Sequence, residues 1–109
     1  MRAATLLAGL ALCALAPAAE AQSASAARGR ALAEQHCARC HAVGRAGASR
    51  HERAPPLRVV ARKYRPADLE EALAEGIVVS HRAPEMPEFS FTPRQIDDLI
   101  AHLARLRAK

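Results

Sequence analysis

The sequence predicts a small all-α domain whose centre is filled by something larger than its own side chains. Apolar residues recur at helical spacing over residues 69–73 and 96–106, and no β-hairpin signal or internal repeat is present. The chain has 109 residues, of which 50% are hydrophobic, but only 3% are aromatic and none is Trp. Such a chain struggles to build a stable core unaided, so a disulfide, a metal, a partner or a large cofactor is expected.

Residues 1–21 have the features of a secretory signal peptide. An apolar stretch over residues 3–16 is followed at residues 19–21 by the small-residue pattern that predicts cleavage before Gln22. An uncleaved anchor is the alternative, but the stretch is short for a bilayer. We therefore expect a mature domain of residues 22–109 in the periplasm, without stable membrane insertion.

Three helices are expected in the mature chain. Ser25 is placed to cap a first helix of about residues 26–36, and a second helix over about residues 67–75 ends at Gly76. The last helix follows a capping box that begins at Thr92, with a proline directly after it. Its apolar stripe consists of Ile96, Leu99, Ile100, Leu103 and Leu106. Loops are expected over residues 44–56 and 77–91, with a short apolar patch at residues 57–60.

Charge is distributed unevenly along the chain. Residues 28–65 contain ten Arg or Lys and two Glu, whereas residues 66–98 contain two Arg and eight Asp or Glu. Aromatic residues are not interleaved with the basic ones, so nucleic acid is not expected as a partner. A protein partner with an acidic docking surface fits the basic stretch better, and a solvated basic face is the alternative.

The most specific motif is the pair Cys37 and Cys40 with His41 directly after it. C-x-x-C-H is typical of c-type haem attachment, because both sulfurs reach one edge of the macrocycle and form thioethers. The adjacent imidazole then becomes the fifth ligand of the iron. A thioredoxin-like pair needs a βαβ context and a zinc site needs a second ligand pair, and the sequence provides neither. One covalently bound haem c is therefore expected, and it would fill the centre of the domain.

Met86 is the expected sixth ligand of the iron. It is the one methionine left after removal of the signal peptide, and it lies in an expected loop directly before Pro87. A neutral thioether ligand raises the reduction potential of haem iron. His81 in the same loop is the alternative ligand. The other histidines, expected to be ordinary surface or helix-face residues, are His36, His51 and His102.

With these motifs the chain resembles the class I c-type cytochromes over about residues 25–107. The resemblance implies a cytochrome c fold, in which three to four short helices wrap around one covalently attached haem. Gly29 is similar to the glycine of that family's first helix, whereas Ala33 and His102 stand where aromatic residues are usual. These departures predict that the first helix crosses the last through Gly29 and Ala33 against Leu99.

The resemblance also implies further cofactor-binding residues. The carbonyl of Pro55 is expected to accept a hydrogen bond from the imidazole of His41, with Pro56 as the near alternative. Leu57 is similar to the leucine that lines the haem. Arg62 is similar to a basic residue near a haem propionate, and a solvated surface charge is the alternative.

The function that the resemblance implies is electron transport rather than catalysis. A His/Met-ligated haem would carry single electrons between a donor and an acceptor protein, with no need for a general base or nucleophile. The chain would be a monomer or the dedicated haem subunit of a periplasmic dehydrogenase complex. A ligand-binding haem protein with an open site is a further alternative, which requires that Met86 does not bind the iron.

Overall fold

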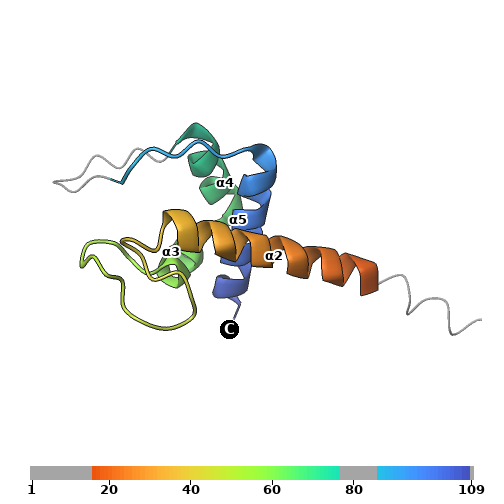
Figure 1. The fold of residues 1–109 in the computed structure, drawn as a ribbon, viewed down its shortest axis with the longest axis horizontal. Helices are drawn as coiled ribbons and strands as arrows, with labels where there is room; N and C mark the ends of the chain where they lie inside the picture. Colours follow the sequence, from red (N-terminus) through yellow and green to blue (C-terminus); the bar gives the residue numbers. More distant parts are fainter. Residues whose placement is uncertain (1–15, 77–85, 109) are drawn as a thin grey trace, which may run out of the picture.

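The computed structural model describes residues 16–76 and 86–108, and these residues form four α-helices and no strand. The helices, labelled as in Figure 1, are α2 (Ala16–His36), α3 (Leu57–Lys63), α4 (Pro66–Glu75) and α5 (Pro93–Arg107). Helix α5 lies at the centre and contacts each of the other three. The all-α prediction is therefore confirmed. None of the described helices is both long and apolar enough to cross a membrane.

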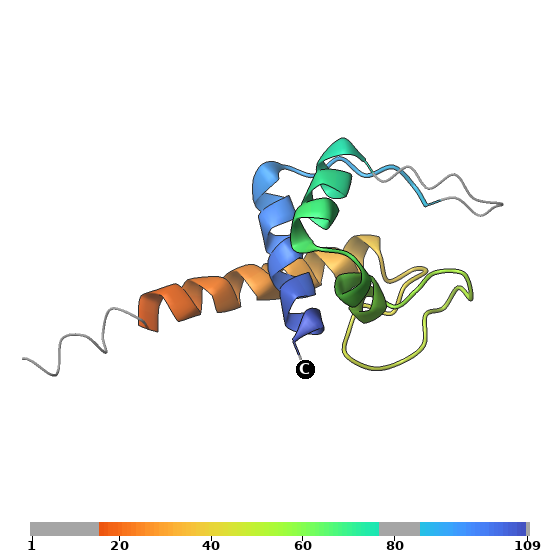
Figure 2. The ribbon, with the colours of Figure 1, turned by 180° about the vertical axis from the view of Figure 1, so that it is seen from behind.

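Helix α2 crosses α5, and two irregular segments extend from the crossing toward one side of the molecule. These segments are the loop of residues 37–56 and the stretch of residues 86–92 that leads into α5. Figures 1 and 2 show both on the same side of α5, while the N-terminal half of α2 extends to the opposite side. The residues of the expected cofactor site therefore lie on the side of the crossing away from the start of α2.

The crossing depends on a glycine. A Cβ atom placed on Gly29 would overlap with the backbone carbonyl of Asp98, so a larger residue would push the two helices apart. Ala26 and Ala33 on the same side of α2 are 3% and 0% exposed, and Leu99 on α5 is 4% exposed. The predicted approach of Gly29 to the Leu99 region of α5 is confirmed, and Ala33 is buried on the same side of α2.

Ser25 does not cap a helix, and that prediction was wrong. Helix α2 begins at Ala16, so Ser25 lies inside it, and its hydroxyl donates to Oδ1 of Asp98 at 2.6 Å. Arg28 donates to both carboxylate oxygens of Asp98, from Nε at 3.0 Å and from Nη2 at 3.1 Å. Asp98 is only 5% exposed, and these two donors hold the pKa of its carboxyl below its usual range. The hydrogen-bonded cluster of Ser25, Arg28 and Asp98, called the polar lock below, thus lies beside the tight contact of the crossing.

The other helix ends largely follow their local signals. Gly76 ends α4 with a φ of 81°, and the capping box of α5 is complete, because Thr92 and Gln95 exchange hydrogen bonds of 3.2 and 2.9 Å. The expected apolar patch at residues 57–60 is instead the start of helix α3. Seven residues are too few to display a clear helical period, so the sequence did not distinguish this helix from a loop.

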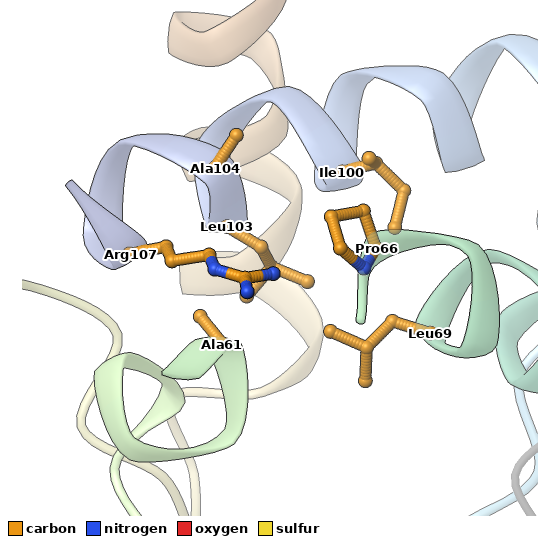
Figure 3. A pocket seen from close by; sticks show the side chains of 7 residues that line it. All are labelled: Ala61, Pro66, Leu69, Ile100, Leu103, Ala104 and Arg107. Atoms are coloured by element: carbon orange, nitrogen blue, oxygen red, sulfur yellow. The ribbon is translucent and has the colours of Figure 1, made fainter. Parts of the chain in front are cut away.

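A shallow apolar recess marks the place where α3, α4 and α5 meet. Figure 3 shows Ala61 of α3 and Leu69 of α4 facing Ile100 and Leu103 of α5, with Arg107 beside them. Ala61 is 2% exposed, so α3 packs closely against α5 at this point. This packing of α3 on α5 positions α3, and with it the residues before α3, on the central helix.

Candidate cofactor-binding site

Both cysteines and the histidine of the motif lie on one turn that continues α2. The amide of Cys37 donates to the carbonyl of Ala33 at 2.8 Å, which extends the helical hydrogen bonding by one residue. The amides of Cys40 and His41 both donate to the carbonyl of Cys37, at 3.1 and 2.9 Å. Spacings of three and four residues on such a turn place the two thiols and the imidazole on one side of it.

The ring of His41 is fixed by a carbonyl. Its Nδ1 lies 2.6 Å from the carbonyl oxygen of Pro55, and because a carbonyl only accepts, Nδ1 carries the proton and donates. The other ring nitrogen, Nε2, then bears the free lone pair. The carbonyl of Pro56 accepts instead from the amides of Val59 and Val60, in the first turn of α3. Of the two prolines considered, Pro55 is the one placed against His41.

The loop between the motif and α3 is held at Ala42. Its amide donates to the hydroxyl of Ser49 at 3.0 Å, and its carbonyl accepts from the amide of Leu57 at 2.9 Å. The amide of His51 donates to the carbonyl of Cys40 at 3.1 Å. These three bonds tie both ends of the loop to the motif, and they bring half-buried Leu57 to the residue beside His41.

His102 also supports this loop from α5, and of the two predicted positions, surface or helix face, it has the helix face and is buried there. It is 4% exposed, and its Nε2 lies 2.8 Å from the carbonyl of Val43, to which it donates. Burial is the main cause that lowers the pKa of His102, with the positive charges of Arg30 and Arg105 acting in the same direction. A neutral imidazole therefore takes the place of the aromatic residue that the resemblance implied.

Met86 begins the second described segment and is half-buried. Three residues later, the ring of Phe89 packs edge-on against His36 at 5.5 Å between centroids, and Phe91 does so at 5.4 Å. His36 directly precedes Cys37, so these rings tie the chain after Met86 to the beginning of the motif. The alternative ligand His81 lies outside the described residues.

The two thiols are unpaired and half-buried. Burial raises the pKa of the Cys37 thiol, which keeps it protonated at neutral pH. A reactive redox cysteine has a lowered pKa, so this environment does not favour thiol–disulfide chemistry. Within residues 16–76 and 86–108, no three His, Cys, Asp or Glu side chains are grouped to hold a metal ion.

Two arginines of α3 differ sharply in environment. Arg62, the residue expected near a propionate, is exposed. Arg58 is only half-exposed, donates from Nη2 to the carbonyl of Gly47 at 2.8 Å, and has a buried Nη1 with no hydrogen-bond partner. Nothing in the sequence distinguished Arg58 from the other nine basic residues of the stretch from 28 to 65.

These residues fit a covalently attached haem. The turn offers two unpaired thiols three residues apart, and His41 offers an Nε2 lone pair on a ring that Pro55 orients. No large side chain is fully buried in the part of the chain that the structure describes. The helices therefore supply a scaffold around the motif rather than a bulky core of their own.

Comparison with known proteins agrees with this assignment. A family model described as "Cytochrome C oxidase, cbb3-type, subunit III" matches residues 24–103, which include the motif, α3, α4 and most of α5. No match was found among curated proteins or among solved structures.

Proposed function

This chain belongs to the family described as "Cytochrome C oxidase, cbb3-type, subunit III", and we propose that it is a periplasmic carrier of single electrons with one haem c. The cytochrome c domain of this family implies haem-based electron transfer with a covalently bound haem. The observation that carries the proposal is the arrangement of Cys37, Cys40 and His41 on one turn, with the Nδ1 of His41 committed to Pro55 at 2.6 Å.

Each residue of the site has a distinct role in this proposal. Bound haem iron supplies a one-electron couple. Cys37 and Cys40 hold the macrocycle through thioethers, and His41 presents Nε2 to the iron. Pro55 fixes the ring orientation and increases the basicity of the ligand, as outer hydrogen bonds to metal-bound histidines do. Leu57 excludes water from the haem face.

Met86 is the proposed sixth ligand. The contacts of Phe89 and Phe91 with His36 support this role, because they anchor the chain that follows Met86 beside the motif. If His41 and Met86 remain bound to the iron in both oxidation states, the reorganisation energy of electron transfer is small. The protein needs no group that moves protons or attacks a substrate, so we propose no enzymatic activity.

The charges around the motif support a protein partner with an acidic docking surface. Four arginines on the loop of residues 37–56 are exposed, and Glu52 is the one acidic residue in that loop. The exposed arginines are Arg39, Arg45, Arg50 and Arg53. Complementary charge increases the rate at which electron-transfer partners meet and makes that rate fall with salt.

The signal-peptide pattern of residues 1–21 supports the proposed periplasmic location. Residues 1–21 would direct export, and cleavage before Gln22 would leave a shortened α2 that still contains Gly29 and leads into the motif. A permanent haem subunit of a larger redox complex is the second candidate, supported by the name of the matching family, which refers to an oxidase subunit. Co-purification with a larger chain at high salt would favour the subunit, and a free monomer would favour the carrier.

The direct test is expression in a periplasm with the haem attachment machinery. We expect a red protein whose mass exceeds that of residues 22–109 by one haem, and whose reduced spectrum is that of a low-spin c-type cytochrome. A colourless protein with both thiols open to titration would contradict the proposal.

Met86→Ala tests the sixth ligand separately. The variant is expected to retain its haem, to lose the weak long-wavelength Met–iron band, to bind carbon monoxide and to have a lower midpoint potential. Unchanged spectrum and potential would exclude Met86 and favour His81 or an open site.

A further inference from the structure

Arg58 carries a buried donor that the protein itself does not satisfy. Its Nη2 donates to the carbonyl of Gly47 at 2.8 Å, which holds the guanidinium against the loop of residues 37–56. Its Nη1 is buried and has no hydrogen-bond partner. Among residues 16–76 and 86–108, none of the ion pairs includes Arg58.

An unpaired buried donor on a cation is costly. Leaving a buried donor without an acceptor costs about 1–3 kcal/mol, and more when the group is charged. A guanidinium presents its donors in a planar fork that matches a carboxylate, so the preferred acceptor is an anion of that shape. Unlike Arg58, three arginines of the described residues form an ion pair with Asp or Glu, namely Arg28, Arg30 and Arg65.

The position of Arg58 places it beside the site. It follows Leu57, whose amide donates to the carbonyl of Ala42, and Ala42 follows His41 in the chain. Pro55, three residues before Arg58, accepts from the ring of His41. The residues on each side of Pro56 are therefore hydrogen-bonded to the motif region, Pro55 to His41 itself and Leu57 to Ala42, the residue after it.

We propose that Arg58, and not Arg62, binds a haem propionate, with Nη1 as a donor to the carboxylate and Gly47 as the support that orients the guanidinium. The inference rests on the proposed function, because it requires the haem. Propionates are ionised at neutral pH and give the buried donor its charged acceptor. Arg62 is exposed on the same helix, where water can satisfy its guanidinium. The sequence resemblance pointed to Arg62, whereas the orphaned atom points to Arg58.

The test compares Arg58→Gln with Arg62→Gln, which removes the same charge four residues later on the same helix. Haem content is measured first on the wild-type protein, by mass and by absorbance. The midpoint potential is then measured across the pH range. A positive charge near the iron disfavours the ferric state, so its loss is expected to lower the potential, more in Arg58→Gln than in Arg62→Gln. The pH at which the potential responds to propionate ionisation is expected to move upward in Arg58→Gln alone.

Arg58→Lys keeps the charge and is expected to recover most of the potential. A merely structural role for Arg58 would lower stability without moving the pH profile, and that result would overturn the inference. An equal or larger effect of Arg62→Gln would overturn it as well.

If Arg58→Gln fails to mature, nuclear Overhauser contacts in the ferrous wild-type protein test the assignment instead. Contacts between the Arg58 guanidinium and the propionate methylenes are expected, and their absence rejects the assignment. A wild-type chain without haem would instead overturn the proposed function, and this inference with it.

Discussion

The crossing of α2 with α5 and the loop that follows the cysteine motif differ in how far the protein's own groups complete them. At the crossing, Gly29 meets the backbone of Asp98 directly, and the Asp98 carboxylate accepts from both Ser25 and Arg28. In the loop, two thiols are unpaired and the Nε2 of His41 keeps its lone pair, and beside the loop Nη1 of Arg58 in α3 has no acceptor.

The α2–α5 crossing is completed by groups of the protein, whereas we propose that the region around the motif is completed by a cofactor. Interiors are packed as densely as organic crystals, and buried donors are nearly always paired. At the crossing, the Asp98 carboxylate and its donors are paired within the protein. We propose that the region around the motif is completed instead by the haem and its carboxylates, so we expect the two regions to respond differently to loss of haem and to mutation.

The largest effect is expected when both thiols are removed. Cys37→Ala/Cys40→Ala should abolish covalent haem and, with it, cooperative thermal unfolding, because the buried apolar side chains of the described residues are three alanines, Ile96, Leu99 and Leu106. Circular dichroism during heating measures this. Arg39→Gln, an exposed change inside the same motif, is the control. A haem-free variant that still unfolds cooperatively would mean that the crossing is a sufficient core.

The next largest effect is expected at the crossing itself. In Gly29→Ala the added Cβ would meet the backbone of Asp98, which cannot move without shifting the whole of α5. We therefore expect a loss of about 3 kcal/mol in the free energy of unfolding. Denaturant titration of the haem protein gives this value. Gly44→Ala is the matched control, since the nearest atom to a Cβ there is Nη2 of Arg30 at 3.9 Å. Equal effects at the two glycines would contradict the close approach.

A smaller effect is expected at the polar lock. Asp98→Asn keeps the side-chain shape but weakens its bonds to Ser25 and Arg28, and we expect a loss of about 1–2 kcal/mol at neutral pH. The exposed neighbour Asp97→Asn serves as control and should be near neutral. Because the folded pKa of Asp98 lies below its usual range, its contribution is complete above the unfolded pKa and is lost as the pH falls below it. The wild type and Asp98→Asn should therefore converge in stability in acid, and parallel curves would reject the lock.

The smallest effect is expected from His102. Since its folded pKa is lowered, the unfolded chain binds a proton first, and stability is expected to fall as the pH drops below about 6.5, the usual value for histidine. His102→Gln retains a donor for the carbonyl of Val43 but does not titrate. Its unfolding free energy should change less between pH 7 and 5 than that of the wild type. The same slope in both proteins would mean that His102 does not contribute to this pH dependence.

Local signals in the sequence predicted several features because their partners are close along the chain. The capping box joins Thr92 and Gln95, three residues apart, and Gly76 ends α4 through its own backbone conformation. The thiols and imidazole of residues 37–41 share one turn for the same reason. The resemblance added Pro55, which lies 14 residues from His41 and which periodicity alone would not have identified.

Long-range pairing explains the wrong prediction for Ser25 and the burial of His102, neither of which could be read from local sequence. Ser25 has the residue type of a helix cap, but its hydroxyl reaches Asp98, 73 residues away, and the helix continues before it. His102 resembles an exposed helix residue until α5 is packed against Val43, 59 residues earlier. The exposed Arg62 and the partly buried Arg58 are indistinguishable as residues of a short basic helix.

The amino-acid sequence alone determined the helical class, the end of α4, the start of α5 and the cofactor motif, because each depends on groups within a few residues of one another. Only the tertiary structure decided which polar side chains are buried and what they meet. Burial arises when distant segments pack together, and an unpaired donor such as Nη1 of Arg58 becomes visible only after every nearby acceptor has been placed.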